Sequence, residues 1–596
     1  MTALALAVLL VAFSEAVPDS ADAPCTGGAV VTRADIEAAG AITISEVLDL
    51  AGALDHVTVD GFDLQPVASV GIPFAEPVRV LVDGAPVALG AGPEPPGLAA
   101  LPVALGEVER VVVCPGLGVA GGAFGGPWID VQTAPPARSL YGAYSLGNEA
   151  GDPGPARYLD PTLPNVDRWG PDVEGAAGLR LGEGAVWASA RRQKMHPTDP
   201  AMLDRTTAAS SRYPKRNAVV AATAGRAAGL RVRLGVRTAE DLPFVPEAGT
   251  EVPLDHASVQ ATVAGDRAVG RLRLGGHLHA ARLRLERPDW SRLDADPSWT
   301  ETRLDAALTA AAGAWAGGVR LDLAEAEGAG LTDGSVVHAS GWGRTDHAGW
   351  RITASASGAG SGLGGGIQVE RPLGSRIMLS AAASRTLPEA ARDLGLWGAR
   401  GADGIARTAR VDTPADVGLV RLGVSNRLGA VRLRASAEVQ AAEGRLRLAE
   451  PDALGSVYAT SGGAVLSRAE AVWQRRGLRV RASARAQGAV WGAAAYRRAW
   501  RRLPRLGGAL DATLRPDDRL ALWARLTLRS GSRWDAFPEA DLPAAALLDL
   551  GLSRRAWGER LRLALGGRNV LGAEERMHPL GAPLAPRLFV RLEARL

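Results

Sequence analysis

A glycine-rich stretch follows an apolar segment in the first quarter of the chain. Residues 108–124 read VERVVVCPGLGVAGGAF, so Gly116, Gly118 and Gly121 have the spacing of a dinucleotide-binding turn. Such a turn holds a pyrophosphate only when a helix opens at its last glycine and an acidic residue follows about 20 positions later. Here Gly-Gly-Pro at 125–127 interrupts any helix, and the segment at the required distance reads PARSLY. The glycines instead favour a tight, packed loop, because only glycine freely adopts the backbone conformations that such a loop needs.

Two histidines in the segment GRLRLGGHLHA could bind a metal or a haem. His277 and His279 lie two positions apart and therefore on one face of a strand, and alternation places Arg271 and Arg273 on the same face. A pair without a third ligand is incomplete, so we favour the alternative that these four residues line a polar lumen. The sequence shows no Ser-His-Asp order, zinc spacing or phosphate loop, and we expect no enzyme, no cofactor and no metal.

The N-terminus has the pattern of an exported protein. An apolar core from Ala3 to Phe13 precedes Ser14-Glu15-Ala16, which predicts a signal peptide over residues 1–16; a short buried helix is the alternative. Cys25 and Cys114 are the only cysteines, and two cysteines in an exported chain are more often bonded than free. We expect a disulfide between them, with two inert thiols as the alternative.

Composition restricts how the chain could cross a membrane. Its 596 residues are 47% hydrophobic, yet no run of about 18 apolar residues occurs, so only strands could span a bilayer. The formal charge of +3 shows no long basic or acidic run, which argues against a nucleic-acid partner. Arginine far outnumbers lysine; this could suit anionic ligands, but a GC-biased codon usage explains it more simply.

The first part of the chain predicts a small α+β domain. Thr32 can cap a short helix through Asp35, and the pair Thr43 and Glu46 has the spacing of a capping box. A short strand at Val30 and Val31 precedes these helices. Three further strand-like segments follow, at 78–87, 108–113 and 128–133, with Gly/Pro-rich loops between them.

After about residue 137 the chain alternates apolar with polar or small residues, which is typical of a transmembrane β-barrel. In the last ten residues, Leu588, Val590 and Leu592 fall on one face, and Arg591 and Glu593 fall on the other. Lipid would contact the leucine face, because an arginine facing lipid at mid-membrane costs about 2 to 4 kcal/mol. The length predicts about 22 antiparallel strands, a size at which the lumen must be filled.

Other interpretations of this region stay open. A soluble all-β array could also alternate, and the segment 304–318 could be helical by composition. Some tryptophans, for example Trp523 and Trp557, are expected in the girdles at the membrane interfaces, with contacts in extracellular loops as the alternative.

The run RVLVDGAPV, followed by LPVALGEVERVVVCPGLGVAGGAFGGPWIDVQT, resembles the plug domain of TonB-dependent outer-membrane receptors. The residues that carry this likeness are Asp83, Gly84, Glu109, Arg110, Gly125 and Gly126. The mid-barrel segment RIMLSAAASRTLPEAARDL and the closing segment LALGGRNVLG are also similar to that family. The resemblance implies a plug over residues 29–137 inside a barrel over residues 138–596.

The resemblance also implies a location and partners. The chain would be a monomer in the cell outer membrane, in contact with its lipid, binding a scarce nutrient of the ferric siderophore, cobalamin or oligosaccharide class. A periplasmic TonB-type protein would supply energy by gripping a short extended segment of the receptor. Residues 17–28, VPDSADAPCTGG, form a short periplasmic segment without a clear TonB box, and the chain ends in Leu596 instead of an aromatic residue. The alternative is a plugged barrel without energised transport, acting as a passive pore or as a structural or binding protein.

Overall fold

The computed structural model describes most of the barrel strands and the central part of the N-terminal domain. The described residues are 28–41, 44–51, 55–57, 65–67, 73, 78–87, 101, 103–114, 128–134, 140–149, 172–181, 184–195, 215–226, 231–244, 252–286, 298–328, 334–359, 362–374, 377–386, 416–450, 453–533, 541–558, 560–573 and 586–596. The predicted signal peptide, the segment 17–28 apart from Gly28, and the boundary near residue 137 lie outside them and stay predictions.

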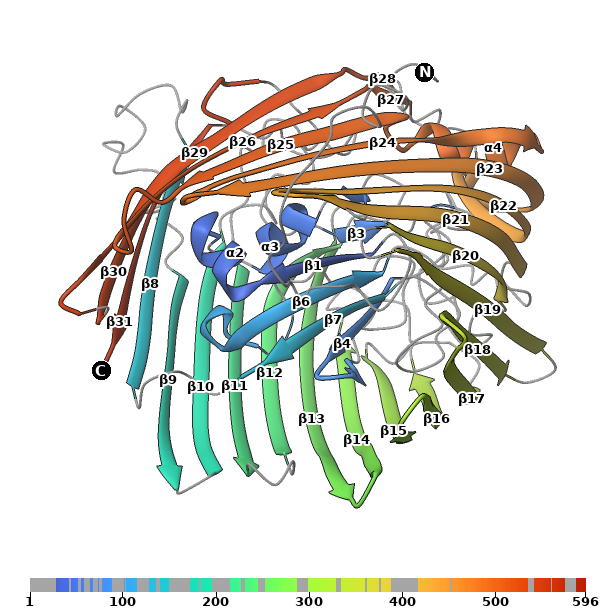
Figure 1. The fold of residues 1–596 in the computed structure, drawn as a ribbon, viewed down its shortest axis with the longest axis horizontal. Helices are drawn as coiled ribbons and strands as arrows, with labels where there is room; N and C mark the ends of the chain where they lie inside the picture. The colour runs from blue at the N-terminus through green and yellow to red at the C-terminus, as the bar shows by residue number, and fades with distance from the viewer. Residues whose placement is uncertain are drawn as a thin grey trace.

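Twenty-two antiparallel strands close into one barrel, in which the first strand, β8, pairs with the last, β31 (Figure 1). The strands are β8 (Leu140–Glu149), β9 (Asp172–Leu181), β10 (Gly184–Met195), β11 (Lys215–Arg226), β12 (Arg231–Phe244), β13 (Val252–Val269), β14 (Leu272–Glu286), β15 (Ser298–Ala312), β16 (Trp315–Gly328), β17 (Gly334–His347), β18 (Trp350–Ala359), β19 (Gly362–Leu373), β20 (Ile377–Thr386), β21 (Asp416–Leu428), β22 (Val431–Glu450), β23 (Ala453–Arg475), β24 (Leu478–Gly492), β25 (Leu506–Leu514), β26 (Leu520–Arg529), β29 (Ala545–Ala556), β30 (Leu561–Arg568) and β31 (Arg587–Arg595). Closure leaves no free strand edge. The predicted barrel and its strand number are confirmed.

The two ends of the barrel differ in the length of their connections. At one end, short turns such as Gly270-Arg271 between β13 and β14 and Arg476-Gly477 between β23 and β24 join successive strands. At the other end most connections are longer, and one contains helix α4 (Ala494–Arg501). A two-stranded sheet of β27 (Ser532–Arg533) and β28 (Asp541–Leu542) also lies in a connection at this end. We call these the short-turn end and the long-loop end.

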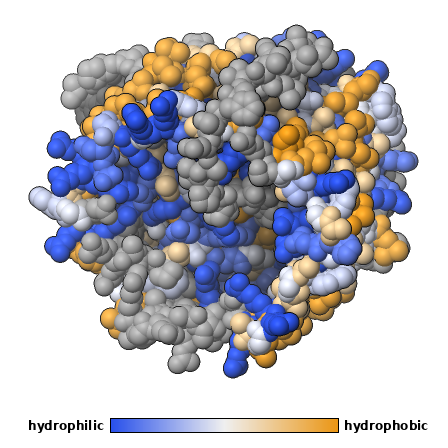
Figure 2. Space-filling model, viewed as in Figure 1, coloured by the Kyte–Doolittle hydropathy of each residue, from blue (hydrophilic) through white to orange (hydrophobic). Residues whose placement is uncertain are grey.

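Alternation along each strand separates an apolar outer face from a polar inner face. In β31, Leu588 and Leu592 are exposed, whereas Arg591 and Glu593 between and beyond them are buried. In β14, Leu278 is 52% exposed and its neighbour His279 is 1% exposed. Figure 2 shows hydrophilic side chains across the middle of the view and hydrophobic ones mainly toward its upper and right-hand rim. The leucine face therefore points outward, as predicted from the cost of arginine in lipid.

One alternative and one expectation for this region are wrong. The segment 304–318 forms parts of β15 and β16 rather than a helix, because cross-strand pairing outweighs the helix preference of its alanines. Trp523 is 5% exposed and its indole stacks on Phe589 inside the barrel, so it does not belong to an interface girdle. Trp557 is 78% exposed in the turn after β29. None of the described helices is both long and apolar enough to cross a membrane.

The N-terminal domain lies inside the ring of barrel strands (Figure 1). Its five-stranded sheet has the order β1-β6-β7-β4-β5, with all neighbours antiparallel except β4 and β7. The elements are β1 (Ala29–Thr32), α2 (Arg33–Ala38), α3 (Ile44–Ala51), β2 (Asp55–Val57), β3 (Gln65–Val67), β4 (Arg79–Val82), β5 (Ala85–Pro86), a 3-10 turn η2 (Leu105–Glu107), β6 (Val108–Cys114) and β7 (Trp128–Thr133). The strands β2 and β3 pair separately.

The cap predicted at Thr32 is present, and it forms a full capping box with Asp35 at the start of α2. The backbone N–H of Asp35 donates to the Thr32 hydroxyl, and the backbone N–H of Thr32 donates to the Asp35 carboxylate over 2.9 Å. This reciprocal pair satisfies two amides that the first turn of a helix leaves without partners. The predicted box at Thr43 and Glu46 involves Thr43, which lies outside the described residues, although α3 begins at Ile44 as expected.

The plug has an apolar core of its own. Side chains from β1, α3, β6 and β7 form one buried cluster whose members all come from residues 29–131. Ile44, Val111 and Ile129, for example, are fully buried. Each such side chain contributes about 1.5 to 3 kcal/mol by leaving water. Among the described residues no barrel side chain belongs to this cluster, so the plug itself supplies the residues of this core.

Candidate functional site: the contact between plug and barrel

A two-residue turn of the plug, Asp83-Gly84, contacts the barrel wall. Both residues have positive φ angles, +53° and +81°, and they join β4 to β5 in a tight hairpin. The Asp83 carboxylate accepts hydrogen bonds from the Thr133 backbone N–H (2.8 Å) and hydroxyl (2.7 Å) at the end of β7. The backbone N–H of Gly84 donates to Asp130 over 2.9 Å. The turn is therefore fixed to the sheet.

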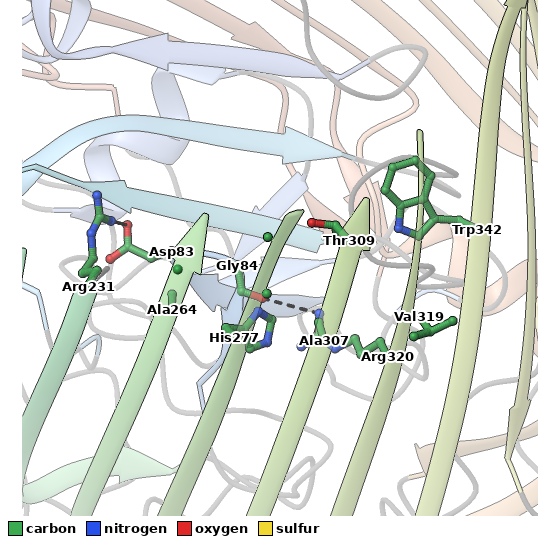
Figure 3. A pocket seen from close by; sticks show the side chains of 13 residues that line it. Asp83, Gly84, Arg231, Ala264, His277, Ala307, Thr309, Val319, Arg320 and Trp342 are labelled. Atoms are coloured by element: carbon green, nitrogen blue, oxygen red, sulfur yellow. Dashed lines mark hydrogen bonds and ion pairs between the residues drawn. The ribbon is translucent and has the colours of Figure 1, made fainter. Parts of the chain in front are cut away.

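Two arginines of the barrel reach this turn from opposite sides. Arg231 donates to the Asp83 carboxylate over 2.8 Å, and Arg320 donates to the Gly84 carbonyl oxygen over 3.4 Å. A cavity of about 330 Å³ lies between the turn and the wall, and His277 and Trp342 also line it (Figure 3). It borders residues near the short-turn ends of their strands.

A buried ion pair joins the turn η2 to the wall. Glu107 accepts a hydrogen bond from Arg233 over 3.0 Å, with side chains 0% and 4% exposed. Burial raises the pKa of Glu107 to about 7, and Arg233 only partly offsets this effect. Nearby, the Leu105 backbone N–H donates to Glu174 of β9 over 2.7 Å, and Glu174 is also paired with Arg591. The contact is thus polar and excludes water.

The helix α2 presents Glu37 to three arginines of the last barrel strands. Arg555 and Arg595 bind its carboxylate over 2.9 and 2.6 Å, and Arg562 donates to its backbone carbonyl oxygen. Burial opposes ionisation, but the guanidiniums of Arg562, Arg595 and Arg33 outweigh it and lower the pKa of Glu37. Glu37 is therefore held as an anion.

Four further pairs have a plug acceptor and a barrel guanidinium, whereas the Leu105 contact with Glu174 runs in the opposite direction. Plug carboxylates or carbonyl oxygens accept from barrel arginines in the pairs Glu46 and Arg568 (3.0 Å), Asp35 and Arg479, Ala51 and Arg481 (2.9 Å), and Ala34 and Arg515 (3.2 Å). We call all of these plug–barrel contacts, from the Asp83-Gly84 turn to these four pairs, the seam. In each of these pairs the plug supplies the acceptor and the barrel supplies the guanidinium.

The amino-acid sequence already contains this division of charge. Residues 29–137 hold 13 Asp or Glu and three Arg, a formal charge of −10, whereas residues 138–596 hold 64 Lys or Arg and 48 Asp or Glu, a formal charge of +16. The near-neutral total of the whole chain hides the difference. Counting charge for each predicted domain would have indicated the seam before the structure was known.

An aromatic contact completes the attachment. Trp523 of β26 lies against Gly40 of the plug, where an added Cβ would be 3.1 Å from the indole nitrogen. The guanidinium of Arg568 lies 4.8 Å from the centre of the same ring and 5.0 Å from that of Phe589. Gly40 has a φ of +60°, so both its backbone and its contact favour glycine.

Comparison with known proteins concerns the fold, because no family model and no curated protein matches the sequence. The siderophore receptor PirA from Acinetobacter baumannii matches with a TM-score of 0.68 at 10% identity, over 95% of this chain and 98% of that chain. The FrpB iron transporter from Neisseria meningitidis, as apoprotein, matches with a TM-score of 0.72 at 10% identity, over 96% and 100%. The ferric citrate transporter FecA, unliganded, matches with 0.64 at 12%, over 96% and 97%.

The chain has the fold of the TonB-dependent receptors. The resemblance stated from the sequence is therefore confirmed at the level of fold, with a plug inside a barrel.

In this TonB-dependent receptor fold, the predicted plug motif residues occupy different environments. Asp83 and Gly84 form the turn of the seam. Glu109 and Arg110 are exposed on β6, where a bulge displaces the register, and Arg110 donates to Gln132 over 2.5 Å. Gly125 and Gly126 lie outside the described residues, as do the three glycines of the dinucleotide-like spacing.

The predicted disulfide is described at one end only. Cys114 is fully buried at the end of β6 and is disulfide-bonded. Cys25 lies outside the described residues, so the pairing with Cys25 stays a prediction.

The four residues expected to line the lumen lie in different environments. His277 and His279 face inward from β14; His277 bonds to Asp305, and His279 bonds to the Thr262 hydroxyl over 2.7 Å. Arg273 lies on the same strand and is exposed, whereas Arg271 is in the turn between β13 and β14. The strand position expected for Arg271 is wrong, because the hairpin turn occupies Gly270 and Arg271. Within the described residues, no group of three or more His, Cys, Asp or Glu could hold a metal ion.

Proposed function

We propose that this chain is an outer-membrane receptor that binds a scarce nutrient outside the cell and admits it when an energising partner displaces the plug. The observation that carries this proposal is that the plug keeps its own apolar core while polar contacts dominate its attachment to the wall. Displacement therefore exchanges guanidinium and carboxylate partners without exposing that core to water.

In this proposal each end of the barrel faces a different side of the outer membrane. The short-turn end faces the periplasm and the long-loop end faces the exterior, since outer-membrane barrels have short periplasmic turns and longer external loops. The seam then lies mostly toward the periplasm: Arg233 is near the start of β12 and Arg595 is at the end of β31. A partner pulling from the periplasm would act on the side where these contacts hold the plug.

We infer the class of nutrient and the energising partner from the structures that this chain resembles. The structures similar to this chain are described as a siderophore receptor, an iron transporter and a ferric citrate transporter. Among the ferric siderophore, cobalamin and oligosaccharide classes, these support the ferric chelates. A periplasmic TonB-type protein would energise uptake, and the receptor would act as a monomer.

A second candidate is a plugged barrel without energised transport. Residues 17–28 favour it, because they show no clear TonB box in the segment where the partner would add a strand.

The test captures the detergent-solubilised full-length protein on the immobilised periplasmic domain of the host's TonB-type protein. Capture that rises with extracts of candidate nutrients supports energised uptake, and a matched periplasmic protein of another class serves as control. No capture by a chain whose N-terminus has been verified would support the second candidate instead.

A further inference from the structure

A short amphipathic helix lies against the inner wall at the long-loop end. α4 connects β24 to β25 (Figure 1). Its apolar side chains join residues of β21, β22 and β23 in one buried cluster. The members from α4 and the residues after it are Ala495, Tyr496, Ala499, Trp500 and Leu503, and those from the wall include Val417, Leu419, Ala442 and Leu466.

These wall residues belong to the inner face of the barrel. Leu419 alternates with Val420, which is 54% exposed on the outer face. The next inward residue, Arg421, is 3% exposed and paired with Glu438. α4 therefore lies inside the mouth of the barrel and not against lipid.

Close contact fixes the position of this helix. A Cβ added to Gly462 would lie 2.2 Å from Cδ1 of Tyr496, so the ring occupies the space that a side chain on β23 would need. Gly492, at the end of β24, has a φ of +133° and leads directly into the helix. The anchor thus consists of buried aromatic groups packed on glycine and aliphatic side chains.

The opposite face of the helix carries only positive charge. Residues 493–505 include five arginines and no Asp or Glu. Arg497, Arg501 and Arg505 are exposed, and within the described part of the chain their side chains have no hydrogen bond or ion pair. Arg497 and Arg501 are one turn apart, which brings their Cβ atoms to within about 6 Å on one side of the helix.

This arrangement suits a multiply charged anion. A guanidinium binds carboxylate and similar oxygens through two parallel hydrogen bonds, and neighbouring guanidiniums can bind neighbouring groups of one ligand. The barrel has a formal charge of +16, and in the seam its guanidiniums are met by plug acceptors. A ligand arriving at the mouth meets guanidiniums that no described carboxylate neutralises.

We propose that Arg497 and Arg501 on α4, together with Arg505 between α4 and β25, form a binding site in the mouth of the barrel for a ligand with two or more anionic oxygen groups. This inference rests on the proposed function and narrows its ligand: anionic metal chelates and acidic oligosaccharides fit, whereas cobalamin and neutral oligosaccharides do not. With this site, part of the excess of arginine over lysine serves ligand binding and is not explained by codon usage alone.

Equilibrium dialysis of the full-length receptor in detergent at low ionic strength tests this site. The anionic probes are ferric citrate, a ferric tris-catecholate and tetragalacturonate, and the neutral probes are a ferric trihydroxamate and cyanocobalamin. We expect at least one anionic probe to bind, and which one binds distinguishes chelates from acidic sugars. Tighter binding of a neutral probe than of every anionic probe, or no anionic binding, would overturn the proposal.

Variants locate the binding. R497S/R501S/R505S should weaken the bound anion at least tenfold, whereas R497K/R501K/R505K should retain most of the affinity because it keeps the charge. The matched control R475S/R519S/R560S removes three exposed arginines at the short-turn end and should bind like the unaltered chain. Equal affinity of the α4 serine variant and the control would contradict the site.

Salt dependence gives a second readout. Affinity for the anion should fall as salt rises, because exposed charges are screened, and the serine variant should show a weaker dependence. Since dialysis uses no energising partner, a failure here is separate from a failure of capture by the TonB-type domain.

Discussion

The seam and the mouth of the barrel both contain many arginines, but their partners differ. At the seam, Arg233 and Arg595 bind the plug carboxylates of Glu107 and Glu37. On α4, Arg497 and Arg501 are exposed, and no carboxylate of the described residues pairs with them. The same residue type therefore holds one domain to another in the first place and offers a site to an external anion in the second. What decides the role is whether the chain supplies its own negative charge opposite.

The largest effect should follow from reversing a charge in the seam. Arg233→Glu places a second carboxylate against buried Glu107 and should lower the opening free energy of β6 by about 5 kcal/mol, since breaking a buried ion pair alone costs about 3 to 5 kcal/mol. Hydrogen exchange of the β6 amides in the full-length receptor measures this free energy. Glu107→Arg combined with Arg233→Glu should recover part of the loss. If the single variant exchanges like the unaltered chain, the seam does not hold the plug.

The aromatic contact should rank next. Trp523→Ala leaves a cavity between Gly40, Phe589 and Arg568, and we expect a loss of about 4 kcal/mol, within the range for buried aromatic truncations. Calorimetry of the full-length receptor measures it. The matched control is Trp557→Ala, whose side chain is 78% exposed and should matter little. Equal losses of stability in the two variants would contradict the burial of Trp523 inside the barrel.

The pH dependence of plug stability should depend on Glu107. Its pKa of about 7 lies above the ordinary value of 4.5, so the closed plug holds a proton that the opened plug releases. The opening free energy should therefore fall as pH rises from about 4.5 to 7, by about 3 kcal/mol in total, and change little further above that window. Glu107→Gln should flatten this part of the profile in hydrogen exchange, while Glu109→Gln at an exposed site should leave it unchanged. A Glu107→Gln profile as steep as the original would show that other groups cause it.

The smallest effect on stability should come from disturbing the anchor of α4. Gly462→Ala forces Tyr496 away from β23 and should cost about 1 to 3 kcal/mol, as overpacking typically does. It should also weaken binding of the anionic probe in dialysis by moving the arginines. The control Gly418→Ala adds a methyl group where no heavy atom lies within 4 Å. Unchanged anion binding in Gly462→Ala would separate the anchor from the binding face.

Local sequence patterns predicted most of the architecture because they reflect local physics. The alternation in β31 follows from a membrane that excludes arginine, and the Thr32 capping box follows from four consecutive residues. Trp523 is inside the barrel and not in the predicted girdle. It lies two residues before Arg525 and next to the exposed Leu522, so the alternation puts it on the arginine side of β26. Residue type alone does not decide which face of a strand a side chain occupies, whereas the phase of the alternation does.

The seam could be predicted only in part. Its pairs join residues far apart in the sequence, 126 positions for Glu107 and Arg233 and 558 for Glu37 and Arg595, and no spacing indicates which side chains will meet. The charge of each domain was nevertheless visible, −10 against +16. α4 escaped prediction because eight residues between two strands give little helical periodicity, and its apolar face becomes meaningful only beside the inner wall.

Exposure of the seam during uptake is the most direct test of the account. Ser553, 6% exposed on the inner face of β29 and two residues before Arg555, can be replaced by cysteine with little change in shape. In cells given the nutrient extract that enhances capture, Ser553→Cys should react with a membrane-impermeant thiol reagent only while the membrane is energised. Asp541→Cys, in β28 at the long-loop end with a side chain 76% exposed, should react under all conditions. Labelling of Ser553→Cys that ignores nutrient and energy would contradict displacement of the plug from the seam.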